Sequence, residues 1–344
     1  MAEIAPNFGA LVISLDFELR WGVRDRVPPD GGWYRQNLLG ARAAIPRMLD
    51  LFEEFGVAAT WATVGCLFAR SRAELEAFRP ATVPHYRDSR LLGYDDALGD
   101  GEDDDPLHYA PSLIEAIRQR PRQEIGSHTF GHYYCLEPGH DRASFRADLA
   151  SAVAIARARG VQLQALVFPR NQFNPSYARD IVEAGFRVCR VNAAAWLYRE
   201  SAGDRYFRPD VRAARLLDAY LPVAGSQVIP WGAIPFVDGL CCLPESRFLR
   251  PFTSRLRAFE PRRLERIISE LQKAAREHGV FHLWWHPHNF GRDTEENLAF
   301  LRQILQAFKC CQDAWGMRSL TMTETATIAT ALRAAGRNEE MQCA

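Results

Sequence analysis

Short apolar runs alternate with amphipathic stretches along most of the chain. The runs are partly β-branched and typical of buried strands, and they lie at 11–15, 58–65, 124–128, 165–169, 187–191 and 280–285. Stretches with helical spacing lie between them, at 41–55, 141–159, 175–184, 262–278 and 295–309. Strand and helix units in alternation predict a parallel sheet with helices outside it. We therefore expect an α/β fold, a distorted (β/α)7 barrel of about seven units, formed by 1–344 as a single domain with its core at about 10–330.

Two segments interrupt this rhythm. Segment 80–111 is a long loop with a run of acidic residues, and segment 198–249 is irregular and rich in Pro, Gly and aromatic residues. Long loops inside compact domains are usually functional or disordered. We expect both insertions to form walls of a substrate cleft, although a solvated loop explains the acidic run equally well. The acidic residues are Asp95, Asp96, Asp100, Glu102, Asp103, Asp104 and Asp105.

Charge and cysteine usage exclude several classes of partner. The 42 basic and 42 acidic residues balance, so no global field draws the chain to nucleic acid. The chain has no uninterrupted apolar stretch of the ~20 residues that a transmembrane helix needs, and no export signal is visible. The 8 cysteines lack the spacing of a disulfide framework, which indicates reduced thiols. We expect a cytoplasmic protein, and nothing in the sequence indicates its oligomeric state.

The first candidate site is an acid pair, Asp16 and Glu18, at the end of the first apolar run. The two-residue period of a strand points both carboxylates to the same side, and strand ends in such sheets bind ligands. Two acids this close repel each other unless a metal ion or a proton lies between them. Taken alone, acidic residues at the end of a strand are more often solvated or cap the next helix.

The second candidate is a histidine pair, His128 and His132, directly after another apolar run. Over one helical turn, this spacing offers two nitrogens to one metal ion. Taken alone, such a short motif more often has no metal. Two histidines and one carboxylate leave an open position for water, which is typical of a catalytic zinc site.

Two further groups follow later strands. His282, His286 and His288 accompany the last apolar run, and His286 is suited to act as a general acid toward a leaving amine. The alternative is an aromatic-rich core strand with structural histidines. Arg170 leaves the run at 165–169 and has the fork geometry to orient a carboxylate, although a surface arginine at a loop start explains it nearly as well.

In this chain order, the four groups resemble the polysaccharide deacetylase family, which includes the nodulation-factor deacetylases and is the fourth family of carbohydrate esterases. The resemblance spans about 10–290, and its clearest motifs are Ser127-His128-Thr129-Phe130-Gly131-His132 and Leu283-Trp284-Trp285-His286. It implies a deformed barrel, a divalent metal ion that is most often zinc, and hydrolysis of an N- or O-acyl group. Two departures stand out: Phe17 replaces the second of two adjacent acids, and the family's Arg-Pro motif appears here as Pro169-Arg170.

The resemblance implies a role for each residue. Glu18, His128 and His132 would hold the metal, and Asp16 would act as base, with the two acids interchangeable. Arg170 would keep Asp16 ionised, and His286, or else His288, would protonate the leaving amine. The expected substrate-binding residues are Arg20, Trp21, Asn171, Trp284 and His288.

The expected substrate is an amino sugar that carries an N-acetyl or N-formyl group, used in surface polysaccharide biosynthesis and linked to a nucleotide or a lipid carrier. The arginine-rich stretch 247–266 would meet a pyrophosphate or a membrane surface, or it is a solvated helix flank. Two alternatives remain open. One is a metal-dependent amidohydrolase acting on a small non-sugar amide such as a ureide or cyclic imide, and the other is a non-catalytic carbohydrate-binding relative.

Overall fold

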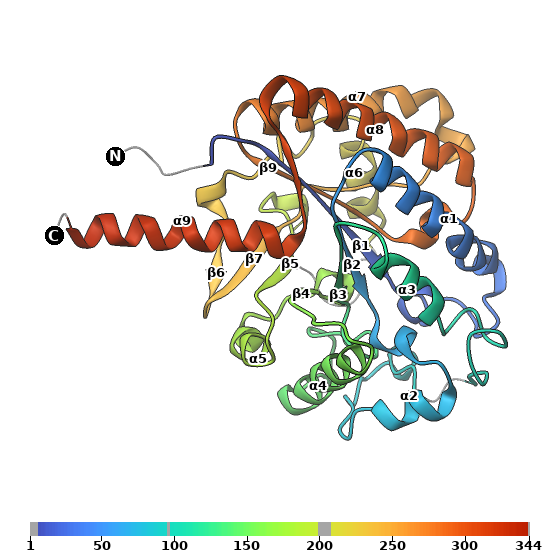
Figure 1. Cartoon of the computed structure of the whole chain (residues 1–344). Helices are drawn as coiled ribbons and strands as arrows, with labels where there is room; N and C mark the ends of the chain where they lie inside the picture. Colours follow the sequence, from blue (N-terminus) through green and yellow to red (C-terminus); the bar gives the residue numbers. More distant parts are fainter. Residues whose placement is uncertain (1–5, 95–96, 199–207, 343–344) are drawn as a thin grey trace.

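Strand β1, Ala10–Phe17, lies inside a curled, mainly parallel sheet (Figure 1). The computed structural model describes residues 6–94, 97–198 and 208–342. The sheet order is β6-β7-β5-β4-β3-β2-β1-β9-β8, and β10 also pairs with β1. The other strands are β2 Ala59–Thr63, β3 Gln123–Ser127, β4 Ala165–Val167, β5 Val188–Val191, β6 Phe236–Val237, β7 Leu240–Pro244, β8 Arg247–Phe248, β9 Val280–Trp285 and β10 Arg318–Leu320.

The segment 240–249, which we call the closing segment, joins the two edges of the sheet. Its first half, β7, pairs with β5, and its second half, β8, pairs with β9. The change of partner occurs between Glu245, whose N–H donates to Val191 O (2.8 Å), and Ser246, whose N–H donates to His282 O (2.8 Å). This curled sheet confirms the expected distorted barrel.

Helices cover the outside of the sheet (Figure 1). Alternate β1 residues Leu11, Ile13 and Leu15 belong to the large core under these helices, whereas Ala10 and Val12 pack with the opposite set of side chains. The helices are α1 Arg35–Glu54, α2 Arg72–Phe78, α3 Pro111–Arg118, α4 Arg142–Ala158, α5 Ala178–Glu183, α6 Pro209–Asp218, α7 Glu260–Arg276, α8 Thr294–Trp315 and α9 Met322–Gln342.

The inner face of the strands changes character along their length. Near the start of β1, Ala10 and Val12 pack with Met322 and Ala326 of α9 in an apolar cluster. Further along the same face, the strand presents Ser14 and then Asp16, both buried. The carboxyl ends of the strands therefore surround a polar centre.

The regular apolar runs all became strands, but several other elements were not expected from the sequence. These are β6, β7, β8, β10, α2, α3, α6 and α9. Of the two expected cleft segments, residues 95–96 and 199–207 lie outside the described residues. In the described part of 80–111, Asp105 binds His108 and Glu102 pairs with Arg42, so these acids are satisfied within the fold.

The helices and the cysteines also bear on what the sequence led us to expect. In the described ranges, no helix has both the length and the apolar character needed to cross a bilayer. Seven cysteines in the described part of the chain are present as thiols, and six of these are buried.

Candidate metal and catalytic centre

Three buried side chains from distant parts of the chain converge at the carboxyl end of the barrel. The Nε2 atoms of His128 and His132 lie 3.2 Å and 3.0 Å from Glu18 Oε2. One ligand atom from each residue lies within 4.8 Å of the others, and all three residues are buried. Ligands placed tetrahedrally on zinc at about 2.0–2.1 Å stand roughly 3.3 Å apart, so this spacing fits one metal ion.

The protons on these side chains are also arranged in a way that suits metal binding. The Nδ1 atom of His128 lies 2.9 Å from Val167 O, which assigns the ring proton to Nδ1 and leaves the Nε2 lone pair facing Glu18. Burial lowers the pKa of His132 to about 3, so its ring is neutral. Burial opposes ionisation of Glu18, but His286 and the two facing imidazoles lower its pKa well below the usual range. The donor set is one carboxylate and two imidazoles.

The histidine loop is held by one carboxylate of α4. Asp148 accepts the backbone N–H groups of Phe130 (2.7 Å) and Gly131 (2.9 Å), between the two histidines. This turn has positive φ at Thr129 (65°) and at His132 (59°), conformations that side chains rarely adopt. Buried hydrogen bonds, and not a regular helical turn, therefore hold His132 toward Glu18.

Glu18 is positioned by a glycine one turn later. A Cβ atom built at Gly22 would lie 1.9 Å from Glu18 Cδ and 2.0 Å from its Oε1. Only glycine at position 22 leaves room for the carboxylate in this orientation. The sequence shows Arg20-Trp21-Gly22 after the acid pair, but only the packing reveals why glycine is needed.

Asp16 is paired with Arg190 of β5. Its two carboxylate oxygens each accept a 2.7 Å hydrogen bond from Arg190, and both side chains are buried. Arg190 also donates to Ser14 (3.0 Å) and to Asn171 Oδ1 (2.8 and 3.1 Å). Burial by itself would raise the pKa of Asp16, but Arg190, with His128 and His286, lowers it. Asp16 is therefore a carboxylate held ionised 3.8 Å from His286.

This arrangement corrects the expected role of Arg170. The guanidinium of Arg170 binds Asp25 (2.7 Å) and Glu137 (3.0 Å) and lies over the ring of Tyr134. The arginine on Asp16 is Arg190, which sequence reasoning missed. A charged residue inside the apolar run 187–191 was the available signal, because a buried arginine needs a partner.

His286 lies where β9 ends and faces both acids. Its Nε2 is 3.6 Å from Glu18 Oε1, and its side chain is 25% exposed, in contrast to the buried His128 and His132. The His288 ring stacks on it at 4.9 Å and is buried, and burial lowers the pKa of His288 to about 3. His282 binds Ser14 Oγ (2.8 Å) deeper in the barrel and is structural.

Two expected substrate-binding residues are corrected by their burial. Trp21 is 0% exposed, and its Nε1 donates to His108 O (2.9 Å). Arg20 is buried as well and donates to Pro28 O and Val27 O. Both residues hold the chain after β1, and neither lines the pocket beside His286.

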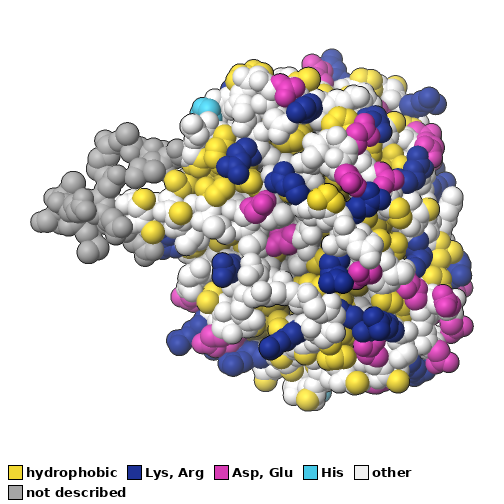
Figure 2. Space-filling view, in the orientation of Figure 1, with side chains coloured by type: hydrophobic (Ala, Val, Ile, Leu, Met, Phe, Trp, Pro, Cys, Tyr) yellow, Lys and Arg dark blue, Asp and Glu magenta, His cyan; other side chains and the backbone are white. Residues whose placement is uncertain are grey.

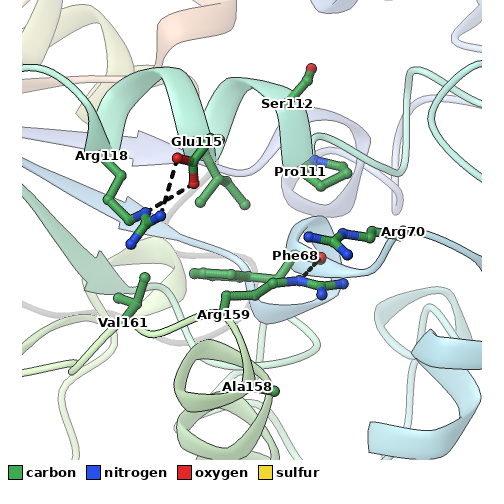
Figure 3. Close-up of a pocket in the computed structure, with 10 residues that line it drawn as sticks. Phe68, Arg70, Pro111, Ser112, Glu115, Arg118, Ala158, Arg159 and Val161 are labelled. Atoms are coloured by element: carbon green, nitrogen blue, oxygen red, sulfur yellow. Dashed lines mark hydrogen bonds and ion pairs between the residues drawn. The ribbon is translucent and has the colours of Figure 1, made fainter.

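A pocket of about 580 Å³ opens beside His286 and is lined also by Asn171 and Trp284, two of the expected substrate-binding residues. Segment 198–249 supplies much of its wall, as expected, including Tyr198 and Arg247. Among the lining residues that the structure describes, none comes from 80–111. A second cavity, of about 670 Å³, lies between α3 and the end of α4 and includes none of the residues of the centre (Figure 3).

Comparison with known proteins gives the fold and a match to one family model. Among solved structures, the chain is similar to a Mycobacterium smegmatis protein provisionally assigned as a polysaccharide deacetylase (TM-score 0.58, 16% identity, 96% of this chain and 92% of that chain). It is also similar to an allantoinase (TM-score 0.52, 14% identity, 94% and 90%) and to a Pseudomonas aeruginosa PAO1 protein with a provisional polysaccharide deacetylase assignment (TM-score 0.51, 14% identity, 93% and 90%).

No curated protein matches the chain. The model of the polysaccharide deacetylase family matches residues 30–189, which include both histidines of the centre. The resemblance seen in the sequence motifs is confirmed by this match and by the shared fold. The chain therefore shares its fold with polysaccharide deacetylases and matches the model of that family over just under half of its length.

Proposed function

We propose that the protein is a metal-dependent hydrolase that removes an N-acyl group, acetyl or formyl, from an amino sugar used in surface polysaccharide biosynthesis. The observation that carries this proposal is the convergence of Glu18, His128 and His132 within 4.8 Å, next to the ion-paired Asp16. The family match supports deacylation as the reaction. A sugar linked to a nucleotide or lipid carrier is the proposed form of the substrate.

Each residue then has a chemical task. Glu18, His128 and His132 would hold the divalent metal, zinc in our proposal, which when bound polarises the acyl carbonyl and lowers the pKa of the attacking water. Asp16 accepts the proton of that water, because its carboxylate is ionised and lies beside the ligand group. Arg190 orients Asp16. His286 faces the pocket, so it is placed to protonate the departing amine.

The rival within the same chemistry is hydrolysis of a small non-sugar amide. The shared fold with an allantoinase, at a TM-score of 0.52, is the observation that favours it. Turnover of ureides or cyclic imides, together with no turnover of acylated amino sugars, would choose this rival.

The test combines metal analysis of the purified protein with acetate and formate release from a panel of acylated amino sugars, free and nucleotide-linked. We expect His128→Ala to lose both metal and turnover and Asp16→Asn to keep the metal and lose turnover. His85→Ala, at an exposed histidine outside the centre, is the matched control and should change neither. Full metal retention by His128→Ala would refute the assignment of the centre. A metal-loaded protein without turnover on the whole panel would favour a binding protein.

A further inference from the structure

The pocket beside His286 is rich in arginine, although the chain as a whole carries no net charge. On the face shown in Figure 2, basic and acidic side chains are interspersed. The pocket differs, because among its described lining residues Glu245 is the only carboxylate. Its arginines are Arg26, Arg170, Arg212, Arg215, Arg247 and Arg250.

Arg247 is the buried member of this group. Its Nη1 donates to Asp218, to the backbone oxygen at 3.1 Å and to Oδ2 at 3.3 Å. Its Nε and Nη2 atoms are buried, and within the described residues neither has a hydrogen-bond partner. An unpaired buried donor costs free energy, and a guanidinium with two free N–H groups has the fork that binds carboxylate or phosphate. The side chain is thus prepared for a bidentate acceptor.

Two neighbours on the same pocket wall also have unused polar atoms. The indole Nε1 of Trp284 and one oxygen of Glu245, Oε2, are buried without a partner in the part of the chain that the structure describes. Three donor atoms and one acceptor atom are therefore unsatisfied around one pocket. A ligand group with several acceptor oxygens matches this surplus of donors, whereas a sugar hydroxyl suits the single acceptor.

The wall is directly connected to the reaction centre. Glu245 and Arg247 lie on the closing segment. Trp284 lies on β9, two residues before His286. The Arg190 guanidinium that holds Asp16 lies 4.1 Å from the centre of the Trp284 ring. Burial raises the pKa of Glu245 to about 7, which reduces its negative charge beside a bound anion.

We propose that this pocket recognises an anionic group on the substrate, a carboxylate or a phosphoryl group, through Nε and Nη2 of Arg247 and the indole N–H of Trp284. The inference rests on the proposed function for its choice of an acylated amino sugar. It adds that the sugar carries a negative charge and that the charged group lies on the side of the centre formed by the closing segment. Neutral acylated sugars are then poor substrates.

Binding measured without turnover tests this inference separately from the reaction. We would titrate the protein with glucose, glucuronate, glucose 1-phosphate and UDP-glucose by calorimetry, because none of these has an acyl group to hydrolyse. We expect the anionic ligands to bind at least about tenfold more tightly than glucose. A preference for glucuronate would identify the group as a carboxylate, and a preference for the other two as a phosphoryl group. Equal binding of glucose and all three anions would overturn the inference.

Variants assign the effect to the wall. Arg247→Met should weaken the preferred anion about ten- to hundredfold, and Trp284→Phe, which keeps a ring and deletes the N–H, about tenfold. Arg179→Met is the matched control, because Arg179 is exposed on α5 and pairs with Glu183. If Arg247→Met does not fold, Trp284→Phe decides, and unchanged anion binding by it would overturn the inference. Anion binding without acyl release from any anionic acylated sugar would instead count against the proposed function.

Discussion

Replacing Arg190 with Met tests the electrostatic arrangement on which the proposed base depends. The Arg190 side chain is 0% exposed and that of Asp16 is 4% exposed, so water cannot replace the lost partner. Removing one half of a buried ion pair costs about 3–5 kcal/mol, against at most about 1 kcal/mol for an exposed pair. Arg190 also donates to Ser14 and Asn171, and these acceptors lose their partner too. We expect Arg190→Met to lower the free energy of unfolding by about 3–5 kcal/mol.

A double-mutant cycle separates this coupling from general damage. Asp16→Asn alone should also destabilise, because it leaves the Arg190 charge buried and unpaired. The double variant removes both charges. Its loss of unfolding free energy should therefore be about 2–3 kcal/mol smaller than the sum of the losses in the two single variants. Urea unfolding of each variant in the presence of a chelator gives the free energies without a contribution from metal binding.

Arg170→Met is the control for this cycle, because the partners of Arg170 are Asp25 and Glu137. Its effect should add to that of Asp16→Asn within about 0.5 kcal/mol. The reasoning is refuted if Arg190→Met costs less than about 1 kcal/mol, or if its effect and that of Asp16→Asn are simply additive.

Two further predictions concern the supports of the centre. Gly22→Ala should cost little stability, because the new methyl group meets only the end of the Glu18 side chain. It should nevertheless weaken metal binding at least about tenfold, because it displaces that carboxylate. Unchanged metal affinity, measured by competition with a chromogenic chelator, would contradict this packing argument. Burial raises the pKa of Asp148 to about 6 despite its backbone hydrogen bonds, about two units above an unfolded Asp. The folded state therefore binds the extra proton, so this group's stabilisation is present below about pH 4 and lost as the pH rises to about 6, an effect of about 3 kcal/mol. Other buried groups titrate in both proteins, so the test is the difference in the free energy of unfolding between wild type and Asp148→Asn, measured with urea from pH 4 to pH 7. This difference should change by about 3 kcal/mol over that range, and parallel curves would rule the effect out.

Much of the fold could be predicted because its main strands are short apolar runs flanked by amphipathic helices. The run at 11–15 became β1, and 280–285 coincides with β9. The missed strands β7 and β8 lie in an irregular segment with many Pro and Gly residues, and their pairing with β5 and β9 depends on the curvature of the whole sheet. That curvature cannot be predicted from residues that are close together in the sequence.

The candidate site likewise has residues that the sequence predicts and residues that it does not. His128 and His132 were recognisable because they lie four positions apart, and Glu18 because it follows the end of a strand. Arg190 pairs with a residue 174 positions away, so spacing gave no indication of it. Trp21 illustrates the opposite error, since an aromatic residue beside an acid pair resembles a sugar platform until its burial is known.

The closing segment has a consequence for redesign. The same few residues link the two edges of the sheet and supply Glu245 and Arg247 to the pocket wall. Exchanges there that alter ligand preference will also loosen the barrel, so selectivity and thermal tolerance will change together. Attempts to broaden the range of accepted sugars should begin at Arg212 and Leu216, which line the same pocket from the exposed surface of α6 and leave the sheet intact.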